Sequence, residues 1–314
     1  MHSATRTIRA AATDRKSMSE IAPGIHRIEE DLGPRFMAQY VLAGDERTLL
    51  VDTGLSETFD TAIAPYLESI GLAVDALDDL VVSHADVDHV GSNRRLRERS
   101  PRTRVWCGES DRGWIESNAR MLAENYRWFE PYGFSLGDEA LGWLERELGG
   151  DAPVDVGLRG GETLRLGPGQ RWEVLALPGH TSGHIGLWHA GERIALVIDA
   201  VLANGIRDRA GKLLIPPRIY DLAGYRRTIS TLRELSPELL LTAHYPLMGR
   251  AEAAEFLDLC DAFCDDAVRV TRAACSGRVP TLKDLVAALD EQLGPYPEFV
   301  AELAAIARSA LAAV

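Results

Sequence analysis

Residues 83–91 constrain this chain more than any other segment, because they place two imidazoles and two carboxylates within six residues. The segment reads Ser-His-Ala-Asp-Val-Asp-His-Val-Gly, and its candidate ligands are His84, Asp86, Asp88 and His89. Residues 78–83 are expected to form an acidic turn and a short buried strand, and 93–99 a polar helix. A strand that ends in a loop at a helix start can aim several ligands at one point, and such nitrogen and oxygen donors suit zinc, iron or manganese. The alternative is that these residues serve only in turns and helix caps.

Four other apolar runs lead into an Asp or a His in the same way. The runs cover 48–51, 172–177, 193–198 and 238–243, and the residues that follow them are Asp52, His180, Asp199 and His244. We predict the runs as strands, because short apolar segments bounded by turn residues are typical of strands, and loops at strand ends often carry function. One such residue alone is expected to be structural, but an ordered series favours a shared site.

The chain resembles the metallo-β-lactamase superfamily over about residues 21–250. The motifs that carry the resemblance are Asp52-Thr53-Gly54, His84-Ala-Asp86-Val-Asp88-His89-Val-Gly91, Pro178-Gly179-His180-Thr181, Asp199 and His244. The resemblance implies an α+β fold, a four-layer αβ/βα sandwich in which two mixed sheets face each other with helices outside. It also implies one or two metal ions at one edge of the sandwich.

The resemblance further implies a role for each of these residues. It matches His84 and His180 to ligands of a first metal, with Asp86 in place of the second His of the pattern His-x-His-x-Asp-His. It matches Asp199 to a carboxylate that bridges both metals. The ligands implied for the second metal are Asp88, His89 and His244. Three residues are expected to support the ligands without binding metal: Asp52, Thr181 and His184.

Asp86 leaves two outcomes open. Either it binds the metal, which gives a harder and more anionic site that favours iron or manganese over zinc, or it falls short and leaves the first site weak. The flavodiiron branch of the superfamily has a Glu at this place, so a carboxylate is compatible with binding. We expect two divalent metal ions, with Zn²⁺ as the first choice and Fe or Mn as alternatives because of Asp86.

A metal pair predicts hydrolytic chemistry. Metal coordination lowers the pKa of water from about 16 to about 7, which makes hydroxide available at neutral pH. We therefore predict a hydrolase that uses metal-bound hydroxide on an ester, thioester or lactone of a small or medium-sized, partly apolar substrate. Asp88 is expected to orient the water and Tyr245 to donate to the oxyanion. The alternatives are a diiron-type oxidoreductase acting on oxygen or a sulfur compound, and a degenerate non-catalytic metal-binding protein.

Composition and charge bear on which binding partners and which cellular compartment to expect. The net charge of −13 over 314 residues argues against a nucleic-acid groove, which needs concentrated Lys and Arg. No apolar run approaches the length of a membrane span, and residues 1–16 contain no secretory apolar stretch. The few cysteines favour a reducing compartment. We expect a cytoplasmic protein with a small-molecule substrate and no nucleic-acid or membrane partner, with residues 1–20 as a disordered leader.

Two helical regions are expected beyond the sandwich. The insert at about 109–150 carries four aromatic residues within seven positions, and the extension at 251–314 contains a capping-box pattern from Thr281 to Asp284. The apolar faces of the extension need burial against the domain, the insert or a second subunit, which leaves a homodimer open. The aromatic residues of the insert either pack helices together or form a lid over the metals. The candidate substrate-pocket residues are Tyr126, Trp128, Phe129 and Tyr132, with Arg218 and Tyr220 from a loop or hairpin at 205–220.

Overall fold

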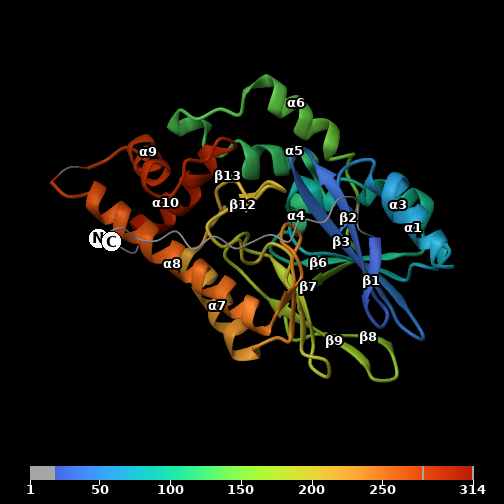
Figure 1. Ribbon diagram of the computed structural model, residues 1–314. Helices are drawn as coiled ribbons and strands as arrows, with labels where there is room; N and C mark the ends of the chain where they lie inside the picture. Colours follow the sequence, from blue (N-terminus) through green and yellow to red (C-terminus); the bar gives the residue numbers. More distant parts are fainter. Residues whose placement is uncertain (1–17, 278, 313–314) are drawn as a thin grey trace.

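Two sheets organise the described residues, which are 18–277 and 279–312 of the computed structural model (Figure 1). Residues 1–17 of the predicted leader lie outside this range, whereas 18–20 belong to the first strand. The first sheet has seven strands in chain order, antiparallel from β1 to β4 and parallel from β4 to β7. Its strands are β1 (Met18–Ala22), β2 (Ile25–Leu32), β3 (Arg35–Ala43), β4 (Thr48–Val51), β5 (Asp79–Val82), β6 (Arg104–Gly108) and β7 (Val156–Leu158).

The second sheet has six strands in the order β15-β14-β11-β10-β9-β8, and only its β11–β14 pair is parallel. Its strands are β8 (Thr163–Gly167), β9 (Gln170–Ala176), β10 (Ile185–His189), β11 (Ile194–Leu196), β14 (Leu239–Leu241) and β15 (Met248–Gly249). Between β11 and β14 a separate hairpin is formed by β12 (Ile206–Arg207) and β13 (Leu213–Ile215). The hairpin lies within the segment predicted as a loop or hairpin.

The sheets pack face to face because successive side chains of a strand point to opposite faces. Leu49 and Val51 of β4 join an apolar cluster shared with Ile194 and Leu196 of β11, which places this cluster between the sheets. Leu50 of β4 instead joins a cluster with the helices outside the first sheet. The alternation therefore produces a central core and two outer cores. This confirms the predicted four-layer αβ/βα sandwich.

Helices from two parts of the chain cover the outer face of the first sheet. The early ones are η1 (Phe59–Ile63), α1 (Ala64–Ser69), η2 (Val74–Ala76), α2 (Val87–Val90) and α3 (Asn93–Arg99). The insert adds α4 (Arg112–Ile115), α5 (Asn118–Met121), η3 (Leu122–Tyr126), η4 (Glu130–Tyr132) and α6 (Gly137–Glu147). Figure 1 shows α6 along the top of the molecule. The insert is helical, as its pattern predicts.

The helices outside the second sheet come from the last third of the chain. They are α7 (Leu222–Leu235), α8 (Arg250–Ala274), α9 (Leu282–Leu293), η5 (Val300–Glu302) and α10 (Leu303–Leu311). The predicted capping box is present, since Asp284 N donates to Thr281 Oγ1 over 3.2 Å and Thr281 N donates to Asp284 Oδ2 over 2.9 Å. One apolar cluster joins these helices to the outer face of the second sheet. The apolar faces of the extension are therefore buried within the same chain.

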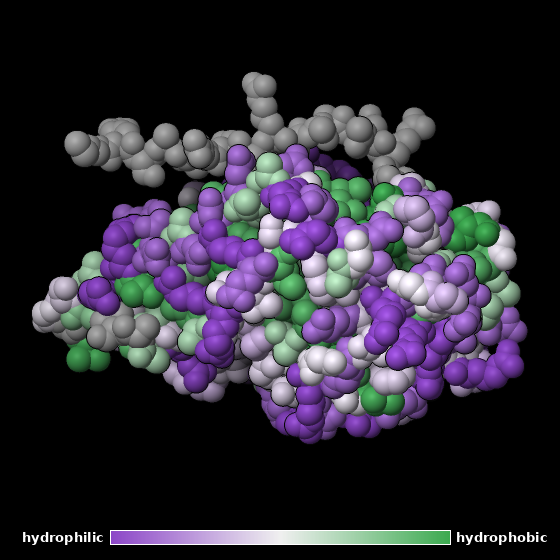
Figure 2. All heavy atoms as spheres, turned by 90° about the horizontal axis from the view of Figure 1, so that it is seen from below, coloured by the Kyte–Doolittle hydropathy of each residue, from purple (hydrophilic) through white to green (hydrophobic). Residues whose placement is uncertain are grey.

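The insert and the C-terminal extension also contact each other directly. The guanidinium carbon of Arg308 in α10 lies 4.8 Å from the ring centre of Trp128, and Lys283 Nζ of α9 lies 6.0 Å from that of Phe134. On the face shown in Figure 2, polar and charged side chains cover most of the surface and apolar ones form small separate patches. Within 18–277 and 279–312, no helix has both the length and the apolar character needed to cross a bilayer.

Candidate metal centre

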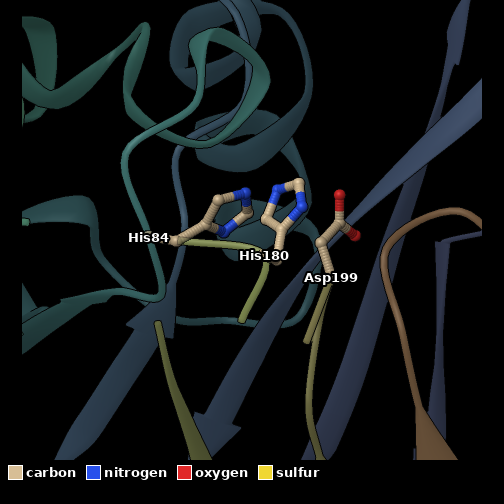
Figure 3. A group of neighbouring side chains, drawn as sticks. All are labelled: His84, His180 and Asp199. Atoms are coloured by element: carbon tan, nitrogen blue, oxygen red, sulfur yellow. The ribbon is translucent and has the colours of Figure 1, made fainter. Parts of the chain in front are cut away.

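Side chains that follow five strands meet at one edge of the sandwich. β4 and β5 are parallel neighbours, and so are β11 and β14, so the residues that follow them leave each sheet at the same edge. Six potential ligands lie there in two groups whose ligand atoms are within 4.8 Å of one another. The first group is His84, His180 and Asp199, and the second is Asp88, His89 and His244. Figure 3 shows the first group directed toward a common space.

The four histidines of these groups are anchored in the same way, through Nδ1. His180 Nδ1 donates to Arg218 O and His244 Nδ1 to Phe36 O, both over 2.8 Å. His84 Nδ1 lies 2.9 Å from Ser83 Oγ, and His89 Nδ1 lies 2.9 Å from Asp52 Oδ2. These contacts engage Nδ1 of each ring, so Nε2 is the nitrogen that is available to a metal ion. Metal-binding histidines have this arrangement, in which the second ring nitrogen is fixed by a hydrogen bond.

Several buried polar atoms at the centre of this cluster have no hydrogen-bond partner among the described residues. They are Nε2 of His84, His89 and His180 and Oδ1 of Asp199. A buried donor or acceptor left without a partner costs roughly 1–3 kcal/mol, so such atoms rarely gather unless something binds them. Imidazole nitrogens and carboxylate oxygens are the ligands that zinc and similar divalent ions take. The residues present therefore fit the metal ions that the resemblance implies.

Asp52 connects two of the ligand-bearing segments. Its Oδ1 accepts from Ser83 N over 2.7 Å, and its Oδ2 accepts from Ser83 Oγ over 2.7 Å and from His89 Nδ1. The carboxylate is fully buried. It thus orients His89 directly and His84 through the Ser83 hydroxyl.

A second buried carboxylate, Asp111, was not predicted from the sequence. It accepts from Gly183 N over 2.7 Å, from Ala85 N over 3.2 Å and from the hydroxyl of Thr181. Burial raises its pKa despite these hydrogen bonds. Asp111 therefore joins the segment that carries His84 to the one that carries His180. The sequence offers one indication of this role, which is that Asp111 comes shortly after the strand at 104–107. An Asp at that place is equally typical of an ordinary turn.

His184 lies beside the centre without joining either ligand group. Its ring stacks on that of His84, with centres 4.6 Å apart and an interplanar angle of 19°. Burial holds its pKa well below the ordinary value, and the neighbouring His84 and His180 lower it further. His184 is therefore a neutral ring packed beside a ligand, and the Thr181 hydroxyl donates to Asp111.

The carboxylates and imidazoles of the two ligand groups shift one another's pKa values. Burial would raise the pKa of Asp88, but His89 and His244 outweigh it and hold the value at about 2. Burial would lower the pKa of His244, but Asp199 and Asp88 raise it to about 10. Burial and the neighbouring His89 lower the pKa of His84 to about 4. The carboxylates are therefore ionised at neutral pH, and metal binding would displace protons from the second group.

Asp86 lies between the first ligand group and a buried arginine. Its Oδ2 is 3.5 Å from His180 Nε2 and 3.8 Å from His84 Nε2. Arg218 Nη2 donates to Oδ2 over 2.9 Å and to Oδ1 over 3.1 Å, and the Tyr126 hydroxyl donates to Oδ1. Whether Asp86 binds the metal stays a prediction.

The structure does not bring Tyr245 into this centre. Its hydroxyl donates to the carbonyls of Leu202 over 2.6 Å and Gly205 over 3.0 Å, and its ring packs on Phe256 in the outer core. The single hydroxyl proton is already committed to these carbonyls. The oxyanion role predicted for Tyr245 is therefore corrected to a structural one.

A cavity opens beside both ligand groups and has mainly apolar walls. The walls come from loops of both sheets, the insert, the β12–β13 hairpin and the C-terminal extension. Its apolar lining residues are Val87, Trp143, Leu144, Leu202, Ile206, Ile215, Pro216 and Phe299. Polar groups, including Arg35, Asp88 and His244, line the remainder.

Only two of the six predicted pocket residues line this cavity, namely Tyr126 and Arg218. Trp128 instead packs against the rings of Phe129, Tyr132 and Tyr220, with ring centres between 5.6 and 6.2 Å apart. Tyr220 also donates to Asn125 O over 2.9 Å. These four aromatic residues form a packing cluster between the insert and the extension, so their assignment to the pocket is corrected.

Comparison with known proteins agrees with the geometry. The family model of the metallo-β-lactamase superfamily matches residues 32–244. The chain is 26% identical over 224 residues to the metallo-β-lactamase fold-containing protein ST1585 of Sulfurisphaera tokodaii, covering 69% of this chain and 75% of that protein. It is 29% identical over 155 residues to a hydroxyacylglutathione hydrolase of a Synechococcus species, covering 49% of this chain and 47% of that protein. The crystal structure of the metallo-β-lactamase family protein TTHA1429 from Thermus thermophilus has the same fold, with a TM-score of 0.70 at 21% identity over 93% of each chain. The chain belongs to the metallo-β-lactamase superfamily.

Proposed function

We propose that this protein is a metal-dependent hydrolase that cleaves an ester, thioester or lactone bond in a small or medium-sized, partly apolar substrate. The observation that carries the proposal is the convergence of buried, unpartnered ligand atoms beside an apolar cavity. The Synechococcus relative adds support for the thioester, because its name denotes hydrolysis of an acylated glutathione.

The two ligand groups would hold two divalent ions, for which we propose zinc. When bound, such ions supply Lewis-acid activation of water and of a carbonyl oxygen. Anchoring through Nδ1 keeps the four imidazoles in a fixed orientation, so that little reorganisation is needed during the reaction. Asp88 lines the cavity and is ionised, and it can accept a hydrogen bond from a water molecule that approaches the substrate.

The apolar walls would bind the acyl part of the substrate. Each buried methylene group contributes about 0.8 kcal/mol, so a few carbons in this cavity are enough to select one acyl length over another. Arg35, at the cavity wall, has its Nη1 3.3 Å from Glu298 Oε2. The charge of Arg35 is thus already paired within the protein. We therefore expect most of the substrate recognition to come from the shape and apolar character of the cavity walls.

The proposal is tested by assaying purified protein against acyl thioesters, aryl esters and lactones of graded chain length. Turnover is expected with at least one of these classes, and it should disappear after chelation and return when zinc is added. His89→Ala should abolish turnover. His189→Ala is the matched control, because His189 lies at the end of β10 outside the centre, and it should retain activity.

Full activity after verified removal of metal would contradict the proposal. Elemental analysis of the purified protein gives a second check. Two iron atoms per chain with visible absorption would favour the oxidoreductase alternative instead.

A further inference from the structure

The environment of Asp86 shows how this chain accommodates a carboxylate where the superfamily pattern has a histidine. Asp86 Oδ2 lies 3.5 Å from His180 Nε2 and 3.8 Å from His84 Nε2. Ligand atoms bound to one ion at about 2.0–2.2 Å in a tetrahedron lie roughly 3.4 Å apart. Both separations are close to this spacing, and the ligand atoms of His84 and His180 lie within 4.8 Å of each other, so the three atoms can reach a common ion.

Replacing a neutral imidazole by a carboxylate adds a negative charge to a buried site, and Arg218 supplies the opposite charge. Both residues are largely buried, with exposed fractions of 6% for Asp86 and 8% for Arg218. Arg218 Nη2 donates to both oxygens of Asp86, and the Tyr126 hydroxyl donates to Oδ1. These contacts fix the carboxylate with Oδ2 next to the two histidines.

Arg218 contacts both sides of the first ligand group. Its side chain holds Asp86, and its backbone carbonyl accepts from His180 Nδ1 over 2.8 Å. The guanidinium is itself held at two further points. Nη1 donates to Asn125 Oδ1 over 3.0 Å, and Nε lies 2.7 Å from Glu302 Oε2. Asn125 belongs to the insert and Glu302 to the C-terminal extension, so both additions reach the metal centre through one arginine.

We propose that Arg218 is a positioning residue that holds Asp86 as a further protein ligand of the first metal position, beside His84, His180 and Asp199, and that Glu302 holds Arg218 in place. The ion-paired chain Glu302–Arg218–Asp86 thereby replaces the missing histidine. This inference rests on the proposed metal dependence but not on which bond is hydrolysed. The competing arrangement is that Arg218 draws Asp86 away from the metal.

The experiment measures zinc stoichiometry and the dissociation constant of the weaker site by competition with a chromophoric chelator. Wild-type protein is expected to bind two zinc ions per chain. Asp86→Asn keeps the size and one oxygen but removes the charge, and it should weaken the weaker site at least tenfold. Arg218→Lys keeps a positive charge but cannot contact three partners at once, and it should weaken that site about tenfold, as is typical for residues that orient ligands.

Glu302→Gln tests the contribution of the extension, with an expected loss of about threefold to tenfold. Glu298→Gln is the matched control. Glu298 lies on the same segment and pairs with Arg35 rather than Arg218, so its substitution should leave both zinc constants within twofold. The absorption of the Co²⁺-substituted protein should change in the Asp86, Arg218 and Glu302 variants and stay unchanged in the control.

Zinc binding by Asp86→Asn with wild-type affinity would overturn the inference, and so would wild-type protein that binds only one zinc. Wild-type protein that binds no metal at all would instead end the proposed function. Melting temperatures of all variants identify any that fail to fold. If Arg218→Lys fails, the Asp86 and Glu302 variants still decide the question, because a purely structural role for Glu302 would lower stability without changing zinc affinity.

Discussion

Asp52 and Asp111 are two buried carboxylates at the same edge of the molecule, and each joins segments that are distant in the sequence. Asp52 connects the segment after β4 to the one after β5, and Asp111 connects the segments that carry His84 and His180. A buried carboxylate can accept several hydrogen bonds at once, and each bond fixes the segment that donates it. The ligand positions are therefore fixed in part by carboxylates that belong to neither ligand group.

Asp111→Asn is expected to destabilise the protein by about 2–3 kcal/mol even without metal, because one of the accepting oxygens becomes an amide that donates. The measurement is urea unfolding in the presence of a chelator. Asp258→Asn is the matched control, since Asp258 is exposed and pairs with Arg233 on the surface. Its expected cost is below about 0.5 kcal/mol. Equal effects in the two variants would contradict the role assigned to Asp111.

Much of the centre could be predicted because its ligands are local features of the sequence. His84, His180, Asp199 and His244 each follow an apolar run, and parallel neighbouring strands bring such ends together. Asp111 was missed because an Asp after a strand also suits an ordinary turn. Tyr245 was misassigned because its neighbour His244 points to the centre while its own hydroxyl is used by the carbonyls of Leu202 and Gly205.

At the level of secondary structure, the insert and the extension hold each other through aromatic and cationic side chains. Trp128 packs on Tyr220 and lies under the guanidinium of Arg308, which brings the segment between η3 and η4 together with α10 and the segment before α7. The pattern of residues predicted helices in both regions. It could not predict that their aromatic residues contact each other instead of the cavity, because that depends on contacts between segments about 180 positions apart in the sequence.

Trp128→Ala is expected to loosen the insert from the extension and to lower the free energy of unfolding by about 2–3 kcal/mol. Cleavage within residues 109–150 by a protease at low concentration should become faster. Tyr132→Ala provides the comparison, because Tyr132 is 46% exposed and contributes one edge of the same cluster. Its effect should stay below about 1 kcal/mol. Unchanged proteolysis of the Trp128 variant would argue against the packing role.

At the scale of the whole molecule, the sandwich supplies the ligands, and the insert, the hairpin and the extension supply most of the apolar walls. Trp143 and Leu144 come from the insert, Ile206 and Ile215 from the hairpin, and Phe299 from the extension. None of these residues was predicted to line the cavity. Their positions depend on how three separate segments pack over the same edge, and a single sequence carries no local signal for that.

Ile215→Trp is expected to fill part of the cavity and to shift selectivity toward shorter acyl groups. For a substrate class that the enzyme hydrolyses, kcat/KM for a long acyl chain should fall about tenfold or more relative to the acetyl analogue. Val279→Trp is the control, because Val279 is 97% exposed. An equal loss for all acyl lengths would show that the substitution disturbs the metal centre and not the walls.

The last turns of the chain also have a consequence for engineering. Phe299 lines the cavity, and three residues later Glu302 pairs with Arg218, which also pairs with Asp86. A deletion of this tail, chosen to obtain a smaller protein, would remove both a wall of the cavity and the ion-pair partner of Arg218. Libraries designed to change acyl preference should therefore vary 299–302 jointly with the hairpin tip and should keep a carboxylate at 302.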